Sequence, residues 1–136
     1  MRCRVVIAED DFFQRTILSR YFESLGTELV TVHNGRSLTA VLCGIEFHLL
    51  VLDYNLPGAE VRQIFEKING CRQPVSVIVI TGDDSVGAQE SIRRLSPDFL
   101  FIKPLEMNDF DDVVRRVLKS SETEYRHEAR EARWTL

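Results

Sequence analysis

Residues whose side chains could bind a cation or carry a phosphoryl group stand at the ends of short apolar runs of this sequence. Five residues have this placement: Glu9, Asp10, Asp53, Thr81 and Lys103. Crowded carboxylates raise one another's pKa, and a divalent cation relieves their repulsion. Oxygen ligands in an incomplete protein cage suit Mg²⁺, which keeps several waters and often shares a phosphate oxygen. An aspartate can accept a phosphoryl group, and an aspartate beside a cation and a lysine suits phosphoryl transfer.

Each of these residues taken alone also has a purely structural explanation. Glu9 and Asp10 could cap the helix that follows, and Asp53 could begin an ordinary turn. Thr81 could cap a helix or form a turn, and Lys103 could be an exposed charge at a strand end. The chemical interpretation therefore depends on whether the fold brings all five residues together.

The apolar runs that precede these residues predict the strands of a parallel sheet. Runs of four residues rich in Val and Ile are typical of strands buried on both faces, and they occur at 5–8, 49–52, 77–80 and 99–102. A weaker strand is predicted at 28–32. Strands that alternate with helices predict a doubly wound α/β fold, with five β-α units here. Ligands of such sheets bind at the carboxyl ends of the strands, where the five residues stand.

Apolar residues at helical spacing predict the five intervening helices. Their apolar faces comprise Ile17, Leu18, Tyr21, Phe22 and Leu25; Leu38, Val41 and Leu42; Val61, Ile64, Phe65 and Ile68; Ala88, Ile92 and Leu95; and Phe110, Val113, Val114, Val117 and Leu118. Gly26 is predicted to stop the first helix. The pair Asn34-Gly35 predicts a turn.

Composition limits the class of protein and its location. The 136 residues carry a net charge of −4, with 44% hydrophobic and 28% charged residues, which excludes a disordered chain and argues against a basic nucleic-acid-binding face. The apolar runs are too short for a transmembrane helix or a signal peptide. Cys3, Cys43 and Cys71 have no zinc or disulfide pattern, so we expect small buried residues in a reducing compartment. We therefore expect a cytoplasmic protein with no direct nucleic-acid or membrane partner.

The stretches around the five residues together resemble a known family. Residues 5–11, 50–58, 79–82 and 102–104 read VVIAEDD, LVLDYNLPG, VITG and IKP. In order and spacing they resemble the receiver domains of two-component response regulators, and the resemblance extends from residue 2 to about residue 120. It implies the flavodoxin-like receiver fold, a (βα)5 arrangement with a five-stranded parallel sheet in the order 2-1-3-4-5.

The resemblance also implies roles for individual residues. Asp53 would be the phosphoacceptor, and Mg²⁺, for which Mn²⁺ could substitute, would be bound by Asp10, Asp53, the backbone carbonyl of Asn55 and, through a water, Glu9. Thr81 and Lys103 would each contact a phosphoryl oxygen. Pro104 would shape the loop after Lys103 through a cis peptide bond.

A phosphorylation-dependent signalling switch is the function that the resemblance implies. The phosphoryl donor would be a histidine kinase, a phosphotransfer protein or a small acyl phosphate, and the chain would not be an enzyme beyond slow loss of its own phosphoryl group. Output would pass to a downstream protein or to an effector domain missing from this chain, and a homodimer is possible. A phosphorylation-independent interaction module is an alternative, which the complete residue set argues against. A phosphatase is a further alternative, and Asn55 argues against it because such enzymes generally have a second Asp there.

Some positions depart from the family pattern. Leu100 stands where the family usually has Tyr or Phe, and the flanking Phe99 and Phe101 should point to the opposite face of their strand, which puts a ring-flip switch in doubt. Further departures are at Gly82, Val61 and Leu105. The helix around Gly87 has few apolar anchors, and we expect it to shift during switching.

The last residues differ in composition from the rest of the chain. We expect a domain at 1–120 and a charged tail at 121–136. Tyr125, Ala129, Ala132 and Leu136 have heptad-like spacing, so the tail could extend the last helix as a dimerisation or signalling helix. The alternative is a solvated tail or a linker to a missing effector.

Overall fold

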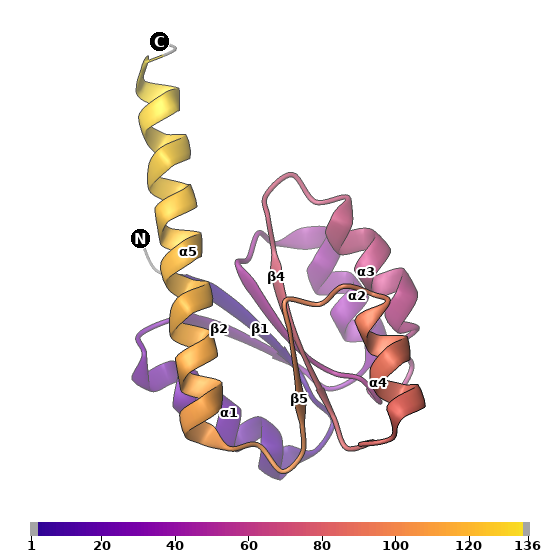
Figure 1. The fold of residues 1–136 in the computed structure, drawn as a ribbon. Coiled ribbons are helices and arrows are strands. Elements are labelled where there is room, and N and C mark those ends of the chain that lie inside the picture. The colour runs from indigo at the N-terminus through magenta and orange to yellow at the C-terminus, as the bar shows by residue number, and fades with distance from the viewer. Residues whose placement is uncertain (1–2, 135–136) are drawn as a thin grey trace.

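A computed structural model describes residues 3–134, with the backbone alone described for 121–134. Strands and helices alternate along the chain, as the sequence predicts (Figure 1). The elements are β1 (Arg4–Ala8), α1 (Phe12–Ser24), β2 (Glu28–Val32), α2 (Gly35–Gly44), β3 (Leu49–Asp53), α3 (Val61–Asn69), β4 (Ser76–Thr81), α4 (Val86–Arg93), β5 (Phe99–Ile102) and α5 (Met107–Trp134).

The strands form one parallel sheet in the order β2-β1-β3-β4-β5, which confirms the predicted topology. β1 lies between β2 and β3, and its Val6 is in register with Val30 and with Leu50. β3 is buried throughout, and β1 and β4 are buried beyond their first residues. The prediction that 99–102 is buried on both faces is wrong, because β5 is an edge strand and its residues are half-buried or exposed.

Helices cover both faces of the sheet, so the domain has two apolar cores. Figure 1 shows α1 and α5 on one face and α2, α3 and α4 on the other. Ile7 and Ile80 of the strands pack with Phe22 and Phe110 on the α1/α5 face. The alternate strand residues pack on the α2–α4 face with residues such as Ile64. This alternation follows from the two-residue period of a strand and explains the continuous apolar runs.

Several helix ends are fixed by their own side chains. The Asp11 carboxylate accepts the Gln14 N–H at 3.0 Å and caps α1. Gly26 lies just beyond α1 with φ +74°, which confirms it as a stop. The turn predicted at Asn34-Gly35 is confirmed only for Asn34, which lies in a bend; its side chain caps α2 by accepting the Ser37 N–H at 2.8 Å, and Gly35 is already the first residue of that helix.

Two expectations about burial are also corrected. Ile17 is 40% exposed, because the neighbouring Leu18 and Phe22 occupy the face of α1 that meets the sheet. Among the described residues none of the three cysteines forms a disulfide, and only Cys3 is buried. Cys43 is exposed near the end of α2 and Cys71 is half-buried. Cys3 precedes β1, Cys43 lies in α2 and Cys71 follows α3, so their burial differs with their place in the fold rather than with residue type.

Helix α5 is the longest element and continues to Trp134 (Figure 1). The boundary expected at residue 120 therefore falls within a continuous helix, and the division into domain and tail stays a prediction. The heptad-like stripe of the tail lies outside the residues whose side chains the structure describes. None of the helices in the described part of the chain is long and apolar enough to span a membrane.

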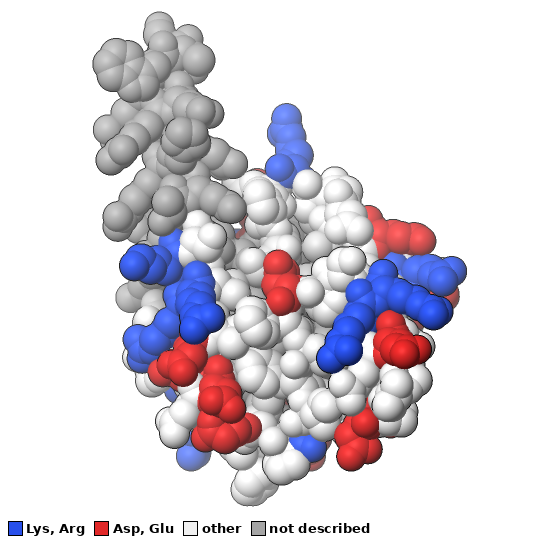
Figure 2. All heavy atoms as spheres, in the orientation of Figure 1, with Lys and Arg blue, Asp and Glu red and all other residues white. Residues whose placement is uncertain are grey.

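Charged side chains of both signs lie next to one another on the face shown in Figure 2. Basic and acidic groups alternate there over α3, α4 and α5, with uncharged surface between them. On this face the described residues thus form no extended basic surface of the kind that binds nucleic acid.

Candidate functional site

Three carboxylates come together at the carboxyl edge of the sheet. Glu9 and Asp10 follow β1, and Asp53 ends β3, which is the parallel neighbour of β1. Each of the three residues offers one oxygen, and these oxygens lie within 4.8 Å of one another. Glu9 and Asp53 are buried, at 1% and 5% exposed, whereas Asp10 is exposed. The cluster therefore has a buried floor and opens to solvent beside Asp10.

Lys103 lies beside the two buried carboxylates. Its Nζ is 3.4 Å from Glu9 Oε2 and 3.6 Å from Asp53 Oδ2. The backbone N–H of Lys103 donates to the Thr81 carbonyl at 2.8 Å, which anchors the start of the loop after β5 to β4. The Lys103–Pro104 peptide bond is cis, as the resemblance implies. One ammonium group thus faces two buried acids, which leaves the cluster with an excess of negative charge.

The Glu9 carboxylate is poorly satisfied by the protein. Its Oε1 accepts the Asp11 N–H at 3.2 Å. Its Oε2 is buried and has no hydrogen-bond partner among the described residues, although it forms the ion pair with Lys103. Burial, and next the charge of Asp53, raise the pKa of Glu9 to about 7, while the Asp11 N–H and Lys103 act in the opposite direction. A cation in the cluster would supply the missing partner and favour the ionised form.

Asp53 begins a tightly hydrogen-bonded loop. Its Oδ1 accepts the Asn55 N–H at 3.0 Å, and its carbonyl accepts the Leu56 N–H at 3.1 Å. The Tyr54 N–H donates to the Ile80 carbonyl at 2.9 Å, which ties this loop to β4. Leu56 is buried in the core of the α2–α4 face. The loop is therefore held to Asp53 by two hydrogen bonds and to the core by Leu56.

Thr81 ends β4 at the same edge of the sheet, in the register position that follows the pairing of Ile80 with Asp53. It is completely buried, and its hydroxyl accepts the Asp83 N–H at 3.1 Å. Because the hydroxyl oxygen accepts in this bond, its own hydrogen remains available for donation. The sheet thus places all five residues named from the sequence at one edge.

Arg15 supports the acidic pair and was not expected from the sequence. Its guanidinium donates to the backbone carbonyls of Glu9 at 2.8 Å and Asp10 at 3.2 Å. The bond pattern fixes the backbone of the loop between β1 and α1. The available signal was the spacing of Arg15 one helical turn after the N-cap Asp11, but that spacing alone does not distinguish it from any exposed arginine.

The structure shows the surroundings of Leu100 and Gly82, two of the positions that depart from the family pattern. Leu100 packs on the α2–α4 face, whereas Phe101 packs on the α1/α5 face against Phe110, with ring centroids 5.4 Å apart. Phe99 stacks with Phe101, which confirms that both aromatic residues point away from the side of Leu100. Gly82 is exposed, and a Cβ built there would meet nothing within 4 Å.

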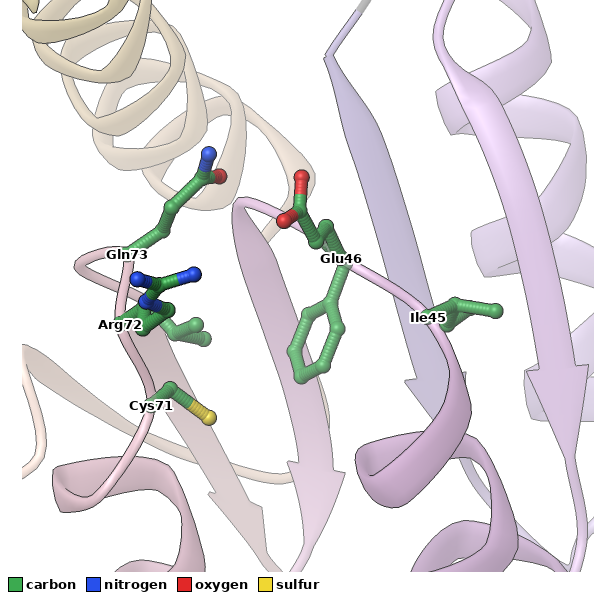
Figure 3. A pocket seen from close by; sticks show the side chains of 7 residues that line it. Ile45, Glu46, Cys71, Arg72 and Gln73 are labelled. Atoms are coloured by element: carbon green, nitrogen blue, oxygen red, sulfur yellow. The ribbon is translucent and has the colours of Figure 1, made fainter.

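A separate hollow of about 180 Å³ lies at the amino ends of the strands, opposite the end that carries the acidic site (Figure 3). Figure 3 shows Cys71 and Arg72 on one wall and Glu46 near the other. These residues belong to the loops that lead into β3 and β4, at the amino ends of the strands. The hollow therefore shares no residue with the acidic site.

The fold is similar to that of solved receiver domains. The receiver domain of a response regulator from Methanospirillum hungatei superposes with a TM-score of 0.80 at 22% identity, over 91% of this chain and 99% of that one. The receiver domain of a sensor histidine kinase from Pseudomonas aeruginosa, solved with a magnesium ion coordinated in its active-site cleft, gives a TM-score of 0.77 at 16% identity, over 88% and 99% of the two chains. At these identities the likeness defines the class of fold.

Sequence comparison identifies the family. Residues 5–115 match the response regulator receiver domain. The response regulator protein FleR of Pseudomonas aeruginosa is 31% identical over 117 residues, which are 85% of this chain and 24% of FleR. The sporulation initiation phosphotransferase F of Bacillus subtilis is 21% identical over 118 residues, 87% of this chain and 95% of that protein. This chain belongs to the response regulator receiver domain family of two-component systems.

Proposed function

We propose that this receiver domain is a phosphorylation-dependent switch that accepts a phosphoryl group on Asp53, with Mg²⁺ bound by the acidic cluster. The observation that carries the proposal is the environment of Asp53. Its carboxylate has one oxygen 3.6 Å from Lys103 and lies in a cluster with Glu9 and Asp10, whose ligand oxygens are within 4.8 Å. A buried nucleophilic carboxylate, a cation site and an ammonium group are what phosphoryl transfer to aspartate needs.

The residues present fit a magnesium ion. All candidate ligand atoms are oxygens, which Mg²⁺ prefers. The buried Oε2 of Glu9 lacks a hydrogen-bond partner among described residues, and the exposed Asp10 leaves the site open to waters. Asp10, Asp53 and the Asn55 carbonyl would bind Mg²⁺ directly, and Glu9 would bind it through a water. When bound, Mg²⁺ supplies neutralisation of the charge on the phosphoryl oxygens. Mn²⁺ could take its place because it also prefers oxygen ligands.

The chain's own residues would carry out the transfer. A carboxylate oxygen of Asp53 attacks the donor's phosphorus, and the bond from phosphorus to the donor breaks with its electron pair leaving on the donor. Lys103 then exchanges its contact with Asp53 for a phosphoryl oxygen, and the Thr81 hydroxyl donates its free hydrogen to another. These new bonds stabilise a second conformation, which is a ligand-driven population shift.

The biological setting is part of the same proposal. A histidine kinase, a phosphotransfer protein or a small acyl phosphate would supply the phosphoryl group in the cytoplasm. The chain spans only 24% of the length of FleR. We therefore propose only that the output passes through a downstream partner, an effector domain or a dimer. Turnover of external substrates is not part of this function.

Intact-mass measurement after incubation with acetyl phosphate and Mg²⁺ tests the proposal. We expect one labile phosphoryl adduct on the native chain, none on Asp53→Asn and none after EDTA. Asp84→Asn is the matched control, since Asp84 is exposed and outside the cluster. An adduct that persists in Asp53→Asn would refute the assignment, and steady release of phosphate from a generic phosphomonoester would favour a phosphatase instead.

A further inference from the structure

The first residue of α2 is in close contact with the loop that follows Asp53. The Gly35 N–H donates to the Pro57 carbonyl at 2.7 Å. A Cβ built on Gly35 would lie 2.2 Å from the Gly58 carbonyl oxygen and 2.5 Å from the Ala59 Cα. Both are backbone atoms, so no side-chain rotation can relieve the clash. The contact therefore exists only because residue 35 has no side chain.

This contact is linked to the site by consecutive hydrogen bonds. The Ala59 N–H donates to the Leu56 carbonyl at 3.2 Å, and the Leu56 N–H donates to the Asp53 carbonyl at 3.1 Å. Between them, the Asn55 N–H donates to the Asp53 carboxylate. Residues 57–59 are therefore connected to Asp53 through Leu56, which directly follows Asn55 in the chain.

We propose that Gly35 is a positioning residue for the cation and phosphoryl site, because its contact with Pro57 and Gly58 fixes the loop that carries Asn55. The inference rests on the proposed function, since it assigns to Gly35 the placement of a predicted metal ligand. Gly35 touches no ligand itself. It acts through the backbone of residues 54–59, which it contacts at Pro57, Gly58 and Ala59.

The size of the effect follows from the clash. Real Cβ atoms essentially never lie closer than 3.0 Å to another heavy atom, whereas a Cβ on residue 35 would lie 2.2 Å from the Gly58 carbonyl oxygen. The loop or the helix must therefore move by about 0.8 Å to accommodate it. Misplacement of catalytic groups by about 1 Å can cost on the order of 100-fold in rate, and changes in the outer support of a metal site typically cost about 10–100-fold in affinity. We therefore expect Gly35→Ala to weaken cation binding at least about tenfold.

The experiment compares two additions of one methyl group to the same helix. Gly35→Ala is set against Gly44→Ala, whose added Cβ meets nothing within 4 Å. Mn²⁺ serves as the probe, and electron paramagnetic resonance of free Mn²⁺ gives the dissociation constant, with circular dichroism as the check on folding. We expect weaker Mn²⁺ binding and slower acetyl phosphate labelling in Gly35→Ala, with Gly44→Ala equal to the native chain.

A native-chain measurement covers the case in which Gly35→Ala does not fold. By linkage, a cation that prefers the fixed loop must also stabilise the contact, so hydrogen exchange of the Gly35 N–H should slow when Mg²⁺ is added. Equal Mn²⁺ affinity in folded Gly35→Ala, or unchanged exchange at Gly35, overturns the inference and leaves the proposed function standing. A native chain that binds no Mn²⁺ overturns both.

Discussion

Glu9 is predicted to lower the stability of the metal-free domain as the pH rises. Burial and the charge of Asp53 raise the Glu9 pKa from its ordinary value of 4.5 to about 7. The folded state therefore keeps a proton that the unfolded state has lost between these values, so the free energy of unfolding falls across this window as the pH rises. At 1.36 kcal/mol per pKa unit, the difference amounts to about 3 kcal/mol.

Replacing Glu9 with glutamine removes this pH-dependent cost and keeps the shape of the side chain. Without metal, the free energy of unfolding of Glu9→Gln is compared with that of the native chain at about pH 4.5 and at about pH 8. The difference between the two proteins should grow by about 3 kcal/mol in favour of the variant between these pH values. Urea unfolding at both pH values measures it, with Glu23→Gln as the control because Glu23 is exposed on α1. Mg²⁺ should then stabilise the native chain more than Glu9→Gln, because the variant lacks the charge that favours the cation. A difference between Glu9→Gln and the native chain that does not change with pH would refute the reasoning.

Three further predictions concern the metal, the packing and the switch. Protonation of Glu9 competes with the cation, so Mg²⁺ affinity measured by calorimetry should fall as the pH drops below about 7, and an affinity that stays constant would contradict the assigned environment. Tyr21→Phe removes the hydroxyl that donates to Asp111 Oδ1 at 2.5 Å between α1 and α5, and chemical unfolding should show a loss of about 1 kcal/mol, since Arg115 still pairs with Asp111. A phosphoryl mimic should change amide exchange across residues 84–95, because α4 buries only Ile92, and unchanged protection would exclude α4 from the switch.

Much of the fold could be predicted because short apolar runs in the sequence indicate where the strands lie. The apolar runs located the strands of the sheet, and the parallel topology alone placed Glu9, Asp53 and Thr81 at one edge. The exposure of β5 was missed because its run FLFI is as apolar as the central strands, although the expected strand order already places β5 at the edge of the sheet. The family resemblance supplied that order, but the burial pattern was read from composition.

The parts of the site that could not be predicted depend on contacts between distant segments. Asn34-Gly35 has the composition of a turn. In the structure Gly35 begins α2 and closely contacts residues 57–59, which are more than twenty positions away in the sequence. Likewise, Glu9 is buried, and its Oε2 has an ion pair with Lys103 but no hydrogen bond among described residues, because of how β1, β3 and Lys103 meet. Residue type indicated which groups could act there, whereas their protonation and support needed the three-dimensional arrangement.

The position of the phosphoryl group on the chain can be determined chemically. After incubation with acetyl phosphate and Mg²⁺, borohydride reduces an aspartyl phosphate to homoserine, and peptide mass spectrometry then identifies the position. We expect homoserine at residue 53 and nowhere else, with none when Mg²⁺ is withheld. Homoserine at Asp10 or another aspartate, or a native chain that is never labelled, would contradict this expectation.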